Sequence, residues 1–95
     1  MKSIIITKQH DLEEEINSGA MTRLAGVSKH LSNATNIHMA IANIPAARCS
    51  TTHYHTNCES AIYVLSGSGL FIHGQNMEIT DEISAGDFIF VPDGA

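Results

Sequence analysis

Short hydrophobic runs separated by Gly, Asn, Ser and Asp residues cover most of this chain of 95 residues. β-Branched and aromatic residues are common in these runs, and both are typical of β-strands. The pattern predicts seven strands: Ser3–Thr7, Met21–Val27, Ile37–Ile44, Ala61–Leu65, Leu70–His73, Met77–Ile83 and Phe88–Val91. Strands of about five residues between closely spaced turns indicate an antiparallel sandwich or barrel.

Helix and turn signals lie between these runs. Asp11–Asn17 predicts one or two helical turns, with Asp11 as the N-cap and Ser18–Gly19 at the end. The segment Ser28–Asn36 is polar, so we expect a loop there with one turn of helix. Tight connections are predicted at three positions that contain glycine: Ser66–Gly69, Gly74–Asn76 and Ala85–Asp87.

The candidate chemistry lies between the third and fourth predicted strands. In an extended segment His53 and His55 point to the same face, with imidazoles about 7 Å apart along the strand. A metal ion can bridge them, because each nitrogen needs to come only to about 2.1 Å from it. A turn at Thr56–Cys58 then lets the chain return and bring Glu59 in as an oxygen ligand. Two His and one carboxylate suit a catalytic divalent metal, iron(II) or manganese more than a structural zinc.

These residues resemble motifs of a known family. His53–Glu59 (H-Y-H-T-N-C-E), followed by Tyr63–Gly67 (Y-V-L-S-G), resembles the first motif of the cupin superfamily. Gly86–Gly94 (G-D-F-I-F-V-P-D-G) is similar to the opening of its second motif. The resemblance covers roughly residues 37–95 and implies an antiparallel jelly-roll barrel, also called a double-stranded β-helix. It also implies a divalent metal near the interior of the barrel, with iron, manganese, nickel and zinc as the candidates.

Two departures from the family pattern affect this interpretation. Seven residues separate Glu59 from Gly67, one more than is usual, so counting back from Gly67 puts Ser60 at the ligand position. A slip of one residue turns a side chain to the other face unless a bulge absorbs it. The family's second motif continues to another metal-binding histidine, whereas this sequence ends at Ala95. We therefore expect an all-β barrel that is incomplete at its C-terminus, from either a fragment of a longer cupin or a naturally shortened chain.

Composition and charge narrow the possible partners and the location. A net charge of −5 argues against nucleic acid or an anionic membrane as the partner. The two cysteines, Cys49 and Cys58, do not suggest a disulfide framework, and we expect Cys58 to be a small buried hydrophobe. With no signal peptide or membrane span in the pattern, we expect a soluble cytoplasmic protein. One domain is expected, with N-terminal strands and a short helix in residues 1–36 and the barrel core in residues 37–95.

Two functions follow from the motif. The first is a metal-dependent oxygenase or isomerase that acts on a small polar molecule, with a general base supplied by His38, His73 or a segment beyond this sequence. The second is a non-catalytic small-molecule-binding or sensor domain, or an inactive fragment of a longer cupin. Both functions involve a small-molecule ligand. An open sheet edge beside Phe88–Val91 also predicts a homodimer.

Overall fold

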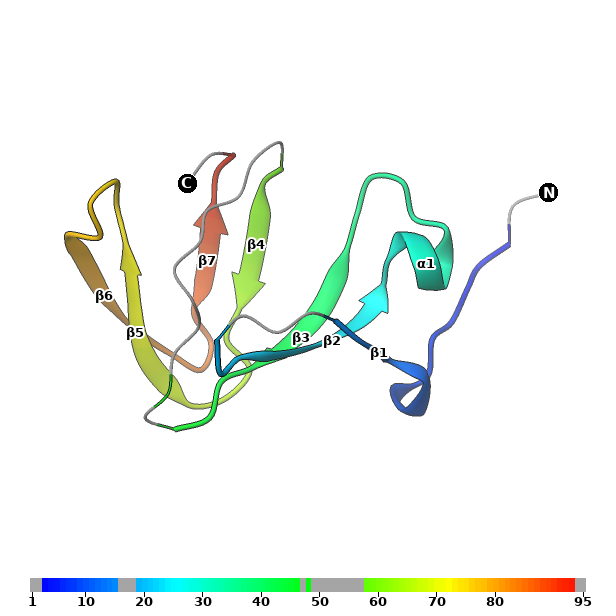
Figure 1. Ribbon diagram of the computed structural model, residues 1–95, viewed down its shortest axis with the longest axis horizontal. Helices are drawn as coiled ribbons and strands as arrows, with labels where there is room; N and C mark the ends of the chain where they lie inside the picture. Colours follow the sequence, from blue (N-terminus) through cyan, green and yellow to red (C-terminus); the bar gives the residue numbers. More distant parts are fainter. Residues whose placement is uncertain (1–2, 16–18, 47, 49–57, 94–95) are drawn as a thin grey trace. The chain divides into compact units, whose positions relative to one another are not determined.

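The computed structural model describes residues 3–15, 19–46, 48 and 58–93. Strands dominate these residues, and their hydrogen bonds form three antiparallel sheets, in the orders β1-β2-β3, β4-β7 and β5-β6 (Figure 1). The predicted all-β fold is confirmed. The chain divides into two compact units, Met1–Thr52 and His53–Ala95, which we describe separately. Over the described ranges, no helix is long and apolar enough to cross a membrane.

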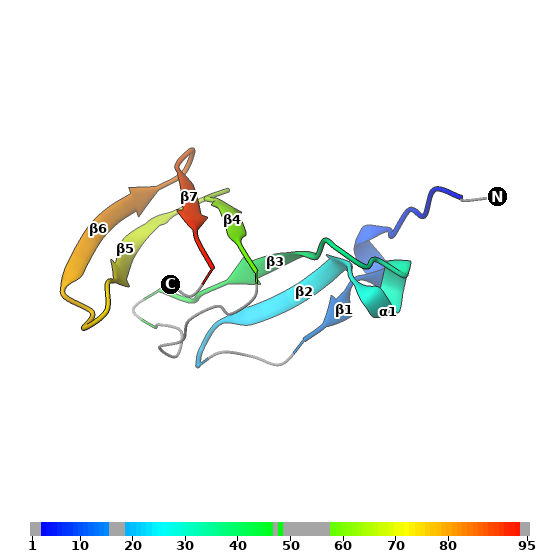
Figure 2. The same cartoon turned by 90° about the horizontal axis from the view of Figure 1, so that it is seen from above.

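The first unit is a three-stranded sheet with one short α-helix. Its elements are η1 (Gln9–Asp11), β1 (Glu13–Glu14), β2 (Thr22–Val27), α1 (Lys29–Ser32) and β3 (Met39–Asn43). Figure 2 shows β2 between β1 and β3, and the central strand carries Ala25, a fully covered side chain with 1% exposure. The predicted strands in this region, Met21–Val27 and Ile37–Ile44, correspond to β2 and β3.

The prediction for the N-terminal residues is wrong in two places. Instead of a helix from Asp11, the chain forms a single 3-10 turn at Gln9–Asp11 and then strand β1. A helix of one or two turns has little stability of its own. Pairing of Glu13 and Glu14 with β2 provides a backbone partner instead. The segment Ser3–Thr7, predicted as a strand, has no ladder partner among the residues that the structure describes.

Helix α1 begins and ends as its flanking residues dictate. The Ser28 hydroxyl accepts a hydrogen bond from the Leu31 backbone N–H at 3.0 Å and caps the N-terminus. Asn33 ends the helix in the left-handed conformation with φ 55°, and its N–H donates to the Lys29 carbonyl. The single helical turn predicted within the polar segment is confirmed.

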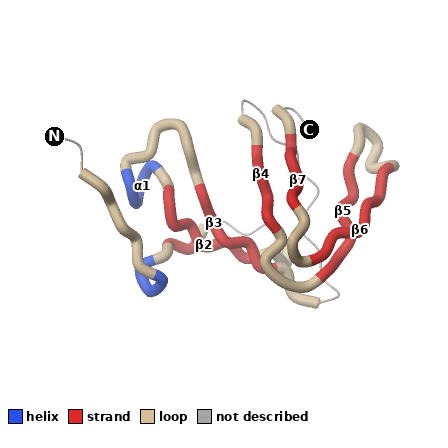
Figure 3. Tube along the Cα trace, turned by 180° about the vertical axis from the view of Figure 1, so that it is seen from behind, coloured by secondary structure: helices blue, strands red, loops and turns tan. Residues whose placement is uncertain are grey.

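The second unit is one long hairpin that bends in its middle. Its strands are β4 (Ser60–Tyr63), β5 (Ser68–His73), β6 (Ile79–Ser84) and β7 (Phe88–Val91). β5 and β6 pair next to the hairpin turn, and β4 and β7 pair on the other side of the bend (Figures 1 and 3). All four strands lie where the sequence predicts them, apart from shifts of one or two residues at their ends.

The bend contains a break in the register of the hairpin. Four residues connect β4 to β5, but only three connect β6 to β7, so the register shifts by one residue across the bend. An extra residue on one strand has the effect of a bulge, which redirects the chain. Three backbone hydrogen bonds cross the bend: Val64 N to Asp87 O (3.0 Å), Gly86 N to Val64 O (2.9 Å) and Ala85 N to Gly67 O (3.0 Å).

Two glycines give the bend its backbone conformation. Gly67 has φ 79° and Gly86 has φ 99°, a region that is unfavourable for a residue with a Cβ atom. Gly86 is the third residue of the turn Ser84–Asp87, which is closed by a 3.1 Å hydrogen bond from Asp87 N to Ser84 O. A second hydrogen bond runs in the other direction, from the Ser84 backbone N–H to the Asp87 carboxylate at 2.8 Å.

We expect Gly86→Ala to lower the free energy of unfolding by about 1–2 kcal/mol. The space around the added Cβ is open, so the positive φ alone causes the loss. Gly69→Ala is the matched control, because its surroundings are equally open and its φ lies outside that region. Urea unfolding of both variants measures the difference, and equal losses would contradict this role of the bend.

Candidate functional site

The structure describes only part of the predicted metal-binding motif. His53 and His55 lie outside the described residues. Glu59 is exposed and directly precedes β4, whereas Ser60 is half-buried, begins β4 and pairs with Val91. The set of His53, His55 and Glu59 as metal ligands therefore stays a prediction, with Ser60 as the alternative to Glu59.

The two faces of the β4–β7 ladder differ in burial. Because side chains alternate along a strand, one face carries Ser60, Ile62, Ile89 and Val91. All of these are half-buried except Ile62, which is 38% exposed. If the extended strand continued backwards, Glu59 would fall on the opposite face. The alternation of side chains therefore places Ser60 on the better-covered face and favours it as the third ligand. Ligand chemistry favours the Glu59 carboxylate instead.

The bend affects how the family spacing is applied. The residues that connect β4 to β5, including Gly67, form the side of the bend with one extra residue. A count back from Gly67 therefore crosses the irregularity before it reaches the ligand position. For this reason the extra residue between Glu59 and Gly67 does not by itself assign the ligand to Ser60.

The other face of the β4–β7 ladder carries aromatic side chains without any charge. We call it the aromatic face, and it consists of Ala61, Tyr63, Phe88 and Phe90. Tyr63 and Phe88 have ring centroids 4.6 Å apart. The exposed fractions are 50% for Tyr63, 80% for Phe88 and 63% for Phe90, so these rings do not form a core within the chain as described.

A histidine–carboxylate pair lies on the β5–β6 ladder. The Nε2 atom of His73 donates a 2.7 Å hydrogen bond to the Asp81 carboxylate. The Phe71 ring lies beside His73, with centroids 5.7 Å apart, and both side chains are half-buried. Asp81 therefore fixes the orientation of the His73 ring, and the Nδ1 atom has no partner within the described ranges.

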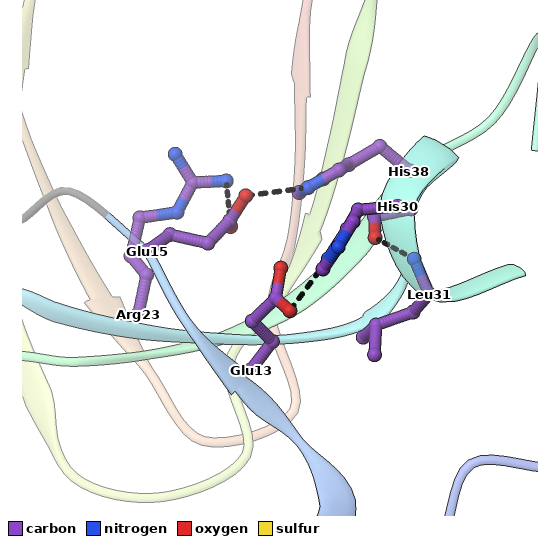
Figure 4. Close-up of polar contacts among 7 residues, drawn as sticks. Glu13, Glu15, Arg23, His30, Leu31 and His38 are labelled. Atoms are coloured by element: carbon purple, nitrogen blue, oxygen red, sulfur yellow. Dashed lines mark hydrogen bonds and ion pairs between the residues drawn. The ribbon is translucent and has the colours of Figure 1, made fainter.

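His38, the other candidate base, belongs to a charged cluster in the first unit (Figure 4). Its Nε2 donates to Glu15 Oε2 at 2.9 Å. Arg23 Nη2 lies 3.5 Å from the buried Oε1 of the same carboxylate, which is an ion pair without a hydrogen bond. His38 precedes β3, so these contacts link β1, β2 and the start of β3.

A second histidine extends this cluster to α1. His30 Nδ1 donates to Glu13 Oε2 at 2.7 Å, so strand β1 is tied to the helix as well (Figure 4). Glu13 lies opposite Ala25, the covered residue of β2. Glu13 in β1 and Glu15 directly after it therefore connect β1 to α1 and to the segment before β3, although their sequence is typical of an exposed helix face.

Cys58 differs from its prediction. It is exposed and has a free thiol, whereas we expected a small buried residue. It lies two residues before β4, where no ladder partner covers it. Within the described ranges, no group of three or more His, Cys, Asp and Glu side chains is arranged to hold a metal ion. A metal site would therefore depend on residues outside these ranges, such as His53 and His55.

Charge is divided unevenly between the two units, and this division can be read directly from the sequence. All five Lys and Arg residues lie in residues 1–52. The second unit contains no Lys or Arg and six acidic residues: Glu59, Glu78, Asp81, Glu82, Asp87 and Asp93. The negative potential of such a unit attracts cations and opposes anionic ligands.

Comparison with known families gives one match. A family model described as Cupin matches residues 8–95, a span that includes the His53–Glu59 motif and all the described strands. No curated protein and no solved structure matches the chain.

Proposed function

This chain belongs to the cupin family, and on that premise we propose that it binds a divalent metal ion and a small polar molecule. In this proposal His53 and His55 supply nitrogen ligands and Glu59 supplies a carboxylate oxygen. The observation that carries the proposal is the His53–Glu59 motif within the matched span, directly before β4. Iron, manganese, nickel and zinc all remain candidates for the metal.

The charge of the second unit supports a cationic occupant. Six acidic side chains and no Lys or Arg give the unit a negative potential, which raises the local concentration of metal ions. Glu59 has no hydrogen-bond or ion-pair partner among the described side chains, so its carboxylate is available to a ligand. Its exposure suits a weak site that exchanges its metal readily.

For the chemistry we propose oxygenase or isomerase activity on a small polar substrate. A bound metal would supply a Lewis-acid or redox centre, and the chain must supply a group that accepts a proton. His73 suits this role because Asp81 holds its Nε2 and leaves the Nδ1 atom without a partner among the described residues. His38 is less suitable, since its Nε2 already helps to hold β1 and β2 together through Glu15.

The alternative is a non-catalytic domain that senses or binds a small molecule. The exposure of Glu59 favours this alternative as much as catalysis, because a reversible binding site does not need to exclude water. Turnover of a bound ligand by the metal-loaded protein would separate the two functions. A homodimer and a cytoplasmic location remain part of the proposal.

We expect His53→Ala and His55→Ala each to remove most of the bound metal while the chain stays folded. Each substitution removes one of at most three protein ligands. Elemental analysis of the purified variants, together with circular dichroism, provides the measurement. His10→Ala is the control, because His10 is an exposed histidine far from the motif in sequence. Unchanged metal content in both motif variants would rule out this ligand assignment.

The same assay distinguishes the two candidates for the third ligand. Glu59→Gln keeps the size of the side chain and removes its charge, and we expect it to reduce the metal content. Ser60→Ala should leave the metal content unchanged. The reverse result would assign the third position to Ser60 and exclude the carboxylate.

We also propose that a second copy of this chain covers the aromatic face. Three of the five aromatic residues of the chain lie there, and the face carries no charge in a chain of net charge −5. Two copies with the same charge repel each other least through a neutral surface, and an apolar surface is complementary to itself.

We therefore expect a homodimer at micromolar concentration that Phe88→Ser weakens, as measured by analytical ultracentrifugation. Phe88 is the most exposed ring of the aromatic face. Ile4→Ser is the control, because Ile4 is equally apolar and even more exposed but lies in the first unit. A monomeric wild-type protein, or equal weakening by both variants, would contradict the assignment.

A further inference from the structure

A hollow of about 440 Å³ lies on the β5–β6 ladder next to the bend. Six residues line it: Ser68, Gly69, Leu70, Glu82, Ile83 and Ser84. Five of these residues are exposed and Ile83 is half-buried, so the hollow is an open depression of the surface. Neither the His53–Glu59 motif nor the His73–Asp81 pair contributes to this hollow.

The register of the ladder puts four of these side chains on one face. Ser68 pairs with Ser84, and Leu70 pairs with Glu82. The two pairs are two residues apart along the strands, so all four side chains point to the same face of the ladder. Two hydroxyl groups and one carboxylate therefore lie beside the apolar Leu70 side chain. The Ser68 and Ser84 hydroxyls lie at the end of this face next to the bend, and the Glu82 carboxylate lies directly across from Leu70 further along the ladder.

Glu82 differs from the neighbouring acidic residues in its partners. Asp81 accepts a hydrogen bond from His73, Asp87 accepts one from Ser84 N, and Glu78 accepts one from Asn76 N. The Glu82 carboxylate has no hydrogen-bond or ion-pair partner in the described part of the chain. Because residues 53–95 contain no Lys or Arg, the unit has no permanently cationic side chain to neutralise it.

We infer that this hollow binds a small organic cation, namely a primary ammonium group on a short alkyl chain. An ammonium group has three N–H donors, and the face presents three acceptors in the Glu82 carboxylate and the Ser68 and Ser84 hydroxyls. The alkyl chain contacts Leu70, and charge pairing with Glu82 fixes the orientation.

Other classes of ligand suit the hollow less well. An anion would meet the negative potential of the unit and find no basic side chain. Calcium usually requires six to eight oxygen ligands, and no group of three metal-binding side chains occurs within the described ranges. The inference does not depend on the proposed metal site.

The test is an NMR titration of the whole ¹⁵N-labelled chain with butylammonium, with a chelator present throughout. We expect saturable shifts at the amides of Ser68, Leu70, Glu82 and Ser84, with a dissociation constant on the order of millimolar. 1-Butanol and butyrate match the ligand in alkyl chain and should give much weaker shifts. Equal shifts with 1-butanol, or shifts spread evenly over the chain, would overturn the inference.

Two variants test the roles of the charge and of the apolar contact. Glu82→Gln should weaken butylammonium binding about tenfold, because it removes a charged hydrogen bond. Asp81→Asn removes the same charge from the next residue, on the opposite face, and should change the affinity much less. Leu70→Ala should weaken the binding of butylammonium more than the binding of methylammonium, which has no alkyl chain to contact Leu70. Equal weakening by Glu82→Gln and Asp81→Asn would show a non-specific effect of charge and would overturn the site.

Discussion

The bend of the long hairpin determines which side chains of the second unit share a face. Three backbone hydrogen bonds and two glycines with positive φ hold it, and the register shifts by one residue across it. On one side the ladder has a better-covered face that begins at Ser60. On the other side it has the His73–Asp81 pair and the hollow at Glu82. The conformation of this short connection therefore determines how the faces of the β4–β7 and β5–β6 ladders continue across the bend.

The two units use their charged residues in opposite ways. In the first unit, Glu13 forms a hydrogen bond with His30, and Glu15 contacts His38 and Arg23, so these carboxylates connect strands and helix. In the second unit, which contains no Lys or Arg, Asp81 pairs with His73, whereas Glu59 and Glu82 have no hydrogen-bond or ion-pair partner among the described residues. The first unit thus uses its carboxylates in contacts between its own elements, whereas two carboxylates of the second unit have no such contact among the described residues.

Much of the fold could be predicted from the sequence because hydrophobic runs and glycine turns coincide with strands and their connections. Phe88–Val91 has the predicted bounds, and α1 lies within its predicted polar segment. The prediction of an N-terminal helix is wrong because tertiary contacts outweigh local propensity. β1 pairs with β2, and the carboxylates of Glu13 and Glu15 contact histidines distant in sequence. The register break at the bend was not predictable either, because it depends on the number of residues in two connections that meet only in the fold.

The central claim is that His53 and His55 bind a divalent metal in the folded chain. Calorimetric melting of the wild-type protein and of the double variant His53→Ala/His55→Ala, each with chelator and with manganese(II) or zinc(II), tests it most directly. A ligand bound only by the folded state raises the melting temperature, and about 1 kcal/mol corresponds to roughly 4–8 °C in a domain of this size. We predict a rise of a few degrees in the wild-type protein and none in the double variant. The same rise in both proteins, or none in the wild-type protein with any of the candidate metals, would contradict the claim.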